Sequence, residues 1–169
     1  MSAQWEWIAN NRSLTHHVMK RHLILVAAVL VISHSSPAAD LFWSGDGLTE
    51  GGAGTWDTTT ARFGTSSGGP FTTVWTNANS DNVTFEATAG TVTLSIITNN
   101  GTLTDNSGYT FFSSTLTLGP SSIINVTGAN TLTASNVFAG GPLTKNGSGT
   151  LLLTGPSAHT YIYQQHCLK

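Results

Sequence analysis

Short runs of alternating threonine and apolar residues recur along this chain, and they are the feature that most constrains its fold. A Thr-Leu-Thr core, or a close variant of it, is centred on Leu94, Leu103, Leu116, Leu132 and Leu152. A period of two places apolar side chains on one face of a β-strand and hydroxyl side chains on the other. Because Gly, Asn, Pro or Ser bounds each run, the pattern predicts many short strands joined by tight turns.

The spacing of these runs predicts coils that stack on one another. The steps from Leu94 to Leu116, from there to Leu132, and on to Leu152 are 22, 16 and 20 residues, close to the repeat lengths of solenoid proteins. No segment shows a helical period. We therefore predict an all-β protein, a right-handed parallel β-helix (β-solenoid) of about four coils over residues 83–161. An antiparallel β-sandwich is the alternative.

An aromatic, glycine-rich segment precedes the regular strands. Residues 40–82 contain Trp43, Trp56 and Trp75, and we expect them to cap the first coil and cover its open strand edge. A second interpretation is that exposed tryptophan rings stack on sugars, as in carbohydrate-binding domains. The cap is favoured because large aromatic side chains are usually at least partly buried.

The N-terminal region has the order of a secretory signal peptide. A basic cluster, Met19–His22, precedes ten apolar residues, Leu23–Ile32, and a stretch of mostly small residues follows up to Ala39. Ten helical residues reach only about half of a 30 Å hydrocarbon layer, so a permanent membrane span is not expected. We predict a signal peptide over residues 19–39 and an untranslated or disordered extension over residues 1–18.

Two cleavage positions fit this signal peptide. Cleavage can follow Ala38, with Ser36 at the third position back, or it can follow Ala39. Either leaves three basic and seven acidic residues, a net charge of −4. No basic patch then remains to neutralise phosphates, so nucleic acid is excluded as a partner class. The single Cys167 cannot form an internal disulfide.

The charged residues do not form a recognisable catalytic set. The carboxylates after residue 39 are spread singly: Asp40, Asp46, Glu50, Asp57, Asp81, Glu86 and Asp105. Two of them could meet in space to serve a glycosidase, but a lyase would also need a basic residue, and only Arg62 and Lys145 lie outside the tail. His159 and His166 are read as loop residues rather than metal ligands. We expect no enzyme activity, no cofactor and no metal.

A motif near the C-terminus carries a family resemblance. Leu143 precedes the turn Lys145, Asn146, Gly147, Ser148 and Gly149, which leads into the run Thr150–Thr154 and a Gly-Pro breaker, and Thr160-Tyr161 closes the motif. This order resembles the autotransporter-associated β-strand repeat of bacterial secreted passenger domains. The resemblance is close over about twenty residues and only general, in the type of residue pattern, over the preceding hundred. The tail, residues 162–169, departs from the repeat, so the resemblance is to a truncated member.

The resemblance implies a non-catalytic, exported β-solenoid that is structural or adhesive at the bacterial cell surface. Its location would be secreted or at the outer membrane, with the inner membrane crossed only during export. Its partner would be a surface glycan or another host or cell-surface molecule, and an open solenoid end could let the chain associate with itself. A carbohydrate-binding β domain is the alternative function.

Overall fold

The computed structural model describes residues 37–156 and 161–163, with side chains described up to residue 156. Every regular element in these residues is a β-strand, and no helix there could span a membrane. The predicted extension over residues 1–18, the predicted signal peptide up to residue 36 and the tail beyond residue 163 lie outside the described residues.

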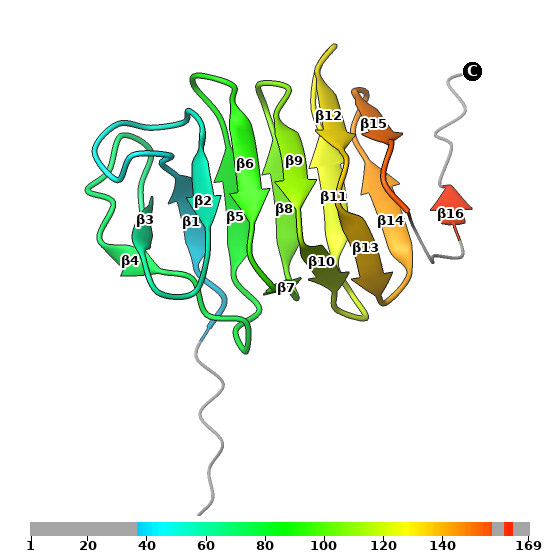
Figure 1. Ribbon diagram of the computed structural model, residues 1–169, viewed down its shortest axis with the longest axis horizontal. Coiled ribbons are helices and arrows are strands. Elements are labelled where there is room, and N and C mark those ends of the chain that lie inside the picture. The colour runs from blue at the N-terminus through cyan, green and yellow to red at the C-terminus, as the bar shows by residue number, and fades with distance from the viewer. Residues whose placement is uncertain (1–36, 157–160, 164–169) are drawn as a thin grey trace, which may run out of the picture. The chain divides into compact units, whose positions relative to one another are not determined.

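The strands form three sheets (Figure 1). The eight-stranded sheet has the order β16 (Tyr161–Tyr163), β14 (Leu143–Asn146), β11 (Ile123–Val126), β8 (Thr102–Asp105), β5 (Asn82–Phe85), β1 (Asp40–Trp43), β3 (Ala61–Gly64) and β4 (Thr73–Val74). The five-stranded sheet has the order β15 (Thr150–Leu153), β12 (Thr131–Ala134), β9 (Thr110–Ser113), β6 (Thr91–Leu94) and β2 (Gly54–Trp56). The three-stranded sheet has the order β13 (Val137–Gly140), β10 (Thr115–Leu118) and β7 (Ile97–Asn99).

Consecutive coils pair in parallel and in register. In the eight-stranded sheet Val83 lies beside Leu103, and Leu103 lies beside Ile124. β5–β6–β7, β8–β9–β10 and β11–β12–β13 are three complete coils, and β14 and β15 begin a fourth. The predicted β-solenoid is therefore confirmed, with about three complete coils rather than four.

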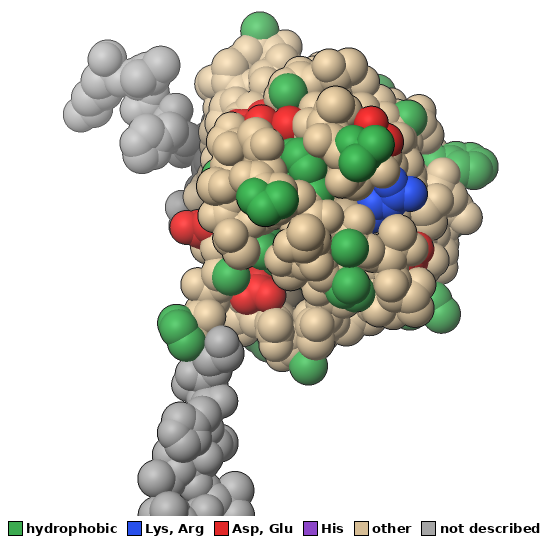
Figure 2. Space-filling view, turned by 90° about the vertical axis from the view of Figure 1, so that its left-hand side faces the viewer, with side chains coloured by type: hydrophobic (Ala, Val, Ile, Leu, Met, Phe, Trp, Pro, Cys, Tyr) green, Lys and Arg blue, Asp and Glu red, His purple; other side chains and the backbone are tan. Residues whose placement is uncertain are grey.

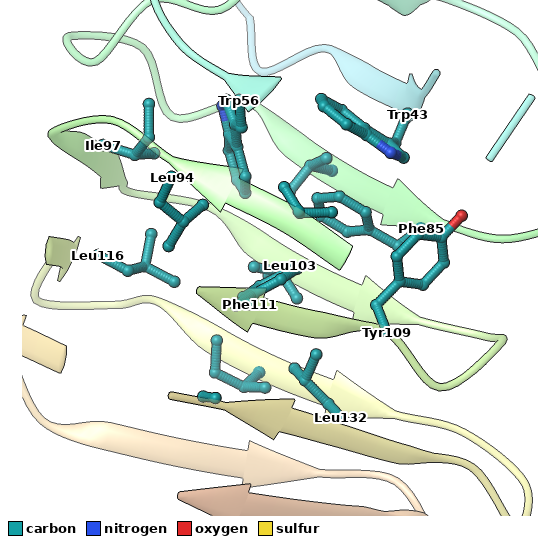
Figure 3. Close-up of a cluster of buried hydrophobic side chains, with 14 of the residues drawn as sticks. Trp43, Trp56, Phe85, Leu94, Ile97, Leu103, Tyr109, Phe111, Leu116 and Leu132 are labelled. Carbon is teal, nitrogen blue, oxygen red and sulfur yellow. The ribbon is translucent and has the colours of Figure 1, made fainter. Parts of the chain in front are cut away.

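The alternation in sequence becomes an alternation of burial. Strands with the pattern Thr-Leu-Thr bury the leucine and leave the threonines partly or fully exposed, as in β8 and β12. The inward side chains of the three sheets meet in one core, which Figure 3 shows for Leu103, Phe111 and Leu116, one from each sheet. Full burial of each such side chain stabilises the fold by about 1.5–3 kcal/mol. No coil could bury these side chains without its neighbours.

The aromatic segment begins as a coil and ends as a cap. β1 pairs in parallel with β5, and β2 pairs in parallel with β6, so both extend the ladders of the later coils. β3 then returns antiparallel to β1, and β4 is antiparallel to β3. Antiparallel strands at this end stop the parallel ladder.

Side chains from the aromatic segment cover the edge of the three-stranded sheet. The Asn77 side chain accepts a hydrogen bond from Thr98 N (2.9 Å) and donates one to Ile96 O (3.0 Å). Trp75 Nε1 donates to Thr98 O (3.1 Å). The edge of β7 that does not pair with β10 therefore has hydrogen-bond partners, which protects it from pairing with other strands.

The predicted repeat intervals mixed two sheets. Leu94 and Leu132 lie in the five-stranded sheet, whereas Leu116 lies in the three-stranded sheet. Leu132 lies beside Leu151 of the next coil, so the step within this sheet is 19 residues. The 22- and 16-residue steps do not measure the length of one coil, because they join strands of different sheets. Every coil carries runs of Thr and apolar residues in more than one of its strands.

The turn of the family-like motif is shorter than predicted. Lys145 and Asn146 belong to β14, where they lie beside Ile124 and Asn125 of the preceding coil. The turn starts at Gly147, whose φ is +78°, and ends at Gly149. Parallel pairing to β11 keeps the two residues before the glycine extended.

Candidate binding face

The three tryptophans considered as sugar-stacking residues are buried. Trp43 and Trp56 are 0% exposed and Trp75 is 1% exposed. Trp56 and Trp75 meet edge to face with ring centroids 4.9 Å apart, and Trp43 meets Phe63 at 5.4 Å. Figure 3 shows Trp43 and Trp56 pointing into the core. No ring face is free to stack on a sugar, and the cluster fills the interior beneath the cap.

The cap end offers no continuous apolar surface. Viewed from the side that carries β3 and β4, hydrophobic side chains form separate spots among backbone and uncharged polar side chains, with acidic and basic side chains between them (Figure 2). Scattered apolar spots are ordinary on a soluble surface. This end therefore closes the stack and is a poor candidate for binding.

Two of the predicted lone carboxylates close turns. Hydrogen bonds from the backbone N–H groups of Thr49 and Leu48 hold the pKa of Asp46 well below its usual value. Burial raises the pKa of Asp57, but bonds from Thr59 and Thr60 outweigh it, so the net shift is downward. A carboxylate with these donors is a poor proton donor.

A third carboxylate has the same structural role. Asp105 is buried and accepts hydrogen bonds from the backbone of Ser107 and Gly108. In the described part of the chain no three His, Cys, Asp or Glu residues come together as a metal site. Asp46, Asp57 and Asp105 therefore hold the backbone of their loops in place.

The outer side of the five-stranded sheet carries regular rows of threonine and apolar side chains. One row across its strands consists of Thr91, Thr110, Thr133 and Leu152. A second row consists of Thr55, Thr93 and Phe112. Neighbouring strands are roughly 4.8 Å apart, so these side chains form a regular array. We call these seven residues the threonine face.

The threonine face combines hydroxyl groups with exposed apolar side chains. Phe112 is 56% exposed and Leu152 is 47% exposed, although both lie within strands. The five strands carry no Asp, Glu, Lys or Arg. Contact with this face would use apolar packing and hydrogen bonds to hydroxyls, and it would be insensitive to salt compared with charge-based recognition. Sequence analysis missed it because strand register decides which alternating residues line up.

This chain is similar to a bacterial autotransporter adhesin. The relative is the adhesin BmaC autotransporter of Brucella suis biovar 1 (strain 1330), with 39% identity over 142 residues. The match covers 80% of this chain but only 4% of the adhesin, so the chain corresponds to a small part of that protein. No protein-family model and no solved structure matches the chain. The similarity agrees with the passenger-type solenoid expected from the sequence. The autotransporter-associated repeat family itself is not confirmed, because no family model matches.

Proposed function

We propose that this chain is a segment of an exported, non-catalytic β-solenoid of the autotransporter-passenger type, structural and adhesive at the bacterial cell surface. The observation that carries the proposal is a continuous parallel stack of coils in a chain 39% identical to an autotransporter adhesin. Stacked coils give a rigid support whose outer faces repeat with every coil. The turn-closing carboxylates are consistent with a role that needs no chemistry.

The threonine face is the surface we assign to adhesion. Its exposed Phe112 and Leu152 can pack against apolar parts of a partner, and the hydroxyls around them supply hydrogen bonds. The partner class that fits is a glycan or protein surface without strong charge. A sugar has apolar ring faces and hydroxyl edges, so it can use both features.

Surface display tests this assignment. The gene is fused to an outer-membrane anchor, and adherence of the displaying cells to host-cell monolayers is counted. The double variant Phe112→Thr and Leu152→Thr is expected to lower adherence several-fold. The matched control is Ile123→Thr and Val137→Thr, which places the same chemistry on the two other sheets, where both side chains face outward and are partly exposed. Equal adherence for both double variants at equal display would contradict the proposal.

A glycan array distinguishes the alternative, a carbohydrate-binding domain. Because Trp43, Trp56 and Trp75 are buried, any glycan binding is expected to depend on the threonine face and to survive changes elsewhere on the surface. Binding that is lost in the Phe112→Thr chain but kept in the Ile123→Thr chain would make a glycan the partner. Binding that both variants keep would place the sugar site elsewhere.

A further inference from the structure

Specific contacts fix Ala39, near the start of the described residues. Ala39 N donates a hydrogen bond to Asp81 Oδ1 (2.9 Å), and Ala39 O accepts one from Asn82 N (2.8 Å). The Ala39 side chain packs against the core. Pro37 and Ala38, in contrast, are exposed. Among the described residues, contacts with the solenoid therefore begin at Ala39, between the two cleavage positions that the sequence allows.

Asp81 is a buried carboxylate in need of donors. It is 8% exposed, and its second oxygen accepts a hydrogen bond from Asn79 Nδ2 (3.1 Å). Burying a carboxylate is costly unless hydrogen bonds and an opposite charge compensate for lost water. The group that donates to Oδ1 is the backbone nitrogen of Ala39, which is a neutral amide as long as Ala38 precedes it.

The two cleavage positions have opposite effects on this contact. Cleavage after Ala39 would remove the donor to Asp81 together with the acceptor for Asn82 N. Cleavage after Ala38 would keep both bonds and convert the donor from an amide into a positively charged ammonium. The sequence agrees, because Ser36 is the third residue back from the first position and Pro37 from the second, and small residues are preferred there.

We propose that the mature chain begins at Ala39 and that its α-ammonium forms an ion pair with Asp81. A signal peptidase adds water across the Ala38–Ala39 amide, which releases the Ala38 carboxylate and leaves the Ala39 amine to take up a proton. Folding then brings this ammonium to the buried carboxylate. The inference rests on the export part of the proposed function.

Mass spectrometry of the exported chain tests the cleavage. The full gene is expressed in a bacterium with a Sec pathway, and the first residue of the exported product is determined from its intact mass and N-terminal peptides. A chain that begins at Ala39 is the expected result. A chain that begins at Asp40, or at any other residue, overturns the inference and leaves export intact. Absence of any exported, shortened product would overturn the export proposal itself.

The pKa of the α-amine tests the ion pair. It is measured by labelling the exported chain with an amine reagent over a pH series. The opposite charge of Asp81 is expected to raise the pKa by about one unit above its ordinary value near 7.7–8.0. Asp40, the neighbouring carboxylate, is itself hydrogen-bonded to Asn82 Nδ2 (2.8 Å) and is present in every variant.

Two variants separate the ion pair from general effects of folding. Asp81→Asn is expected to return the α-amine pKa to its ordinary value. Glu86→Gln is the control, because Glu86 is another carboxylate held by an asparagine, Asn106, and it should leave the pKa raised. An ordinary α-amine pKa in the unchanged chain refutes the pair even if Asp81→Asn fails to fold.

Discussion

Two glycines with nearly the same positive φ have different surroundings. Gly147 has φ +78° and Gly68 has φ +80°, a region in which a side chain is strained. A Cβ on Gly147 would overlap Val126 O of the preceding coil, whereas a Cβ on Gly68 would meet nothing within 4 Å. The difference arises because the Gly147 turn presses against a neighbouring coil.

These surroundings predict unequal costs of the same substitution. Gly68→Ala should lower the free energy of unfolding by about 1–2 kcal/mol, the cost of the left-handed conformation. Gly147→Ala should lower it by about 3 kcal/mol or more, because the backbone of two coils must also move apart. Urea denaturation of both variants measures the difference. Equal losses would show that the turn does not approach Val126.

A buried hydroxyl joins two loops at Tyr109. The side chain is 0% exposed, and its Oη donates to Glu86 O (2.9 Å) or Thr88 O (2.6 Å). Burial raises the pKa of Tyr109 to about 12, above its ordinary value of 10.0. The folded state therefore resists ionisation of Tyr109. The contribution of the protonated hydroxyl to the free energy of unfolding is complete below pH 10 and is lost as the pH rises towards 12.

Tyr109→Phe therefore changes stability in a pH-dependent way. At pH 7 the variant should lose about 0.5–1.5 kcal/mol, because the hydroxyl's hydrogen bond to Glu86 O or Thr88 O is lost, while Thr88 O still accepts one from Gly52 N. Between pH 10 and 12 the unchanged chain should lose stability with a steeper slope than the variant. Urea midpoints across this pH range provide the measurement, and identical slopes would mean that Tyr109 ionises as freely when folded as when unfolded.

At the level of strands, the alternating pattern decides burial, but the position within the stack decides how complete it is. Leu132 of β12 is 0% exposed, with β9 on one side and β15 on the other. Leu151, its partner in β15, is only partly buried. Two leucines in the same row of the same sheet are therefore buried to different extents.

Leucine-to-alanine substitutions should reveal this gradient. Leu132→Ala is expected to lower the free energy of unfolding by about 2–5 kcal/mol, the range for fully buried leucines. Leu151→Ala should cost less than half of that, because fewer neighbouring atoms lose contact. Thermal and urea denaturation of the two chains measure both values. A larger loss for Leu151→Ala would contradict the described order of the coils.

The cap covers the β7 edge with side chains rather than with a strand. Asn77→Ala should remove the partners of Thr98 N and Ile96 O and leave the β7 edge open to other strands. We expect the free energy of unfolding to fall by about 1–3 kcal/mol. We also expect increased self-association, measured by sedimentation-velocity ultracentrifugation. Asn130→Ala is the control, since Asn130 also donates to backbone oxygens but lies in a turn between β11 and β12. Monomeric behaviour of both variants would contradict the edge-covering role.

At the level of the whole molecule, the sequence predicts the architecture better than the register. Alternating Thr and Leu identifies strands and their buried faces, as at Leu103 and Leu132, because a period of two has one structural meaning. It does not say which sheet a strand joins, since the runs around Leu94 and Leu116 look alike but pair with different partners. Register depends on contacts between residues about twenty positions apart, which no local pattern encodes.

The candidate binding face shows the same limit. Phe112 follows the buried Phe111 in a run of two aromatics, and nothing in that run says which ring faces outward. Pairing of Thr93 with Phe112 places its ring beside a threonine on the outer side of the sheet. Residues within single strands were predictable, whereas a surface assembled from five strands was not.

Parallel pairing between neighbouring coils is the central claim, and NMR of the exported chain tests it most directly. Nuclear Overhauser contacts between backbone amide and α protons of β5, β8 and β11 should follow the register that aligns Val83 with Leu103 and Leu103 with Ile124. Such contacts, all in the parallel pattern, are the predicted result. Contacts in the antiparallel pattern between these strands would indicate a β-sandwich and contradict the solenoid.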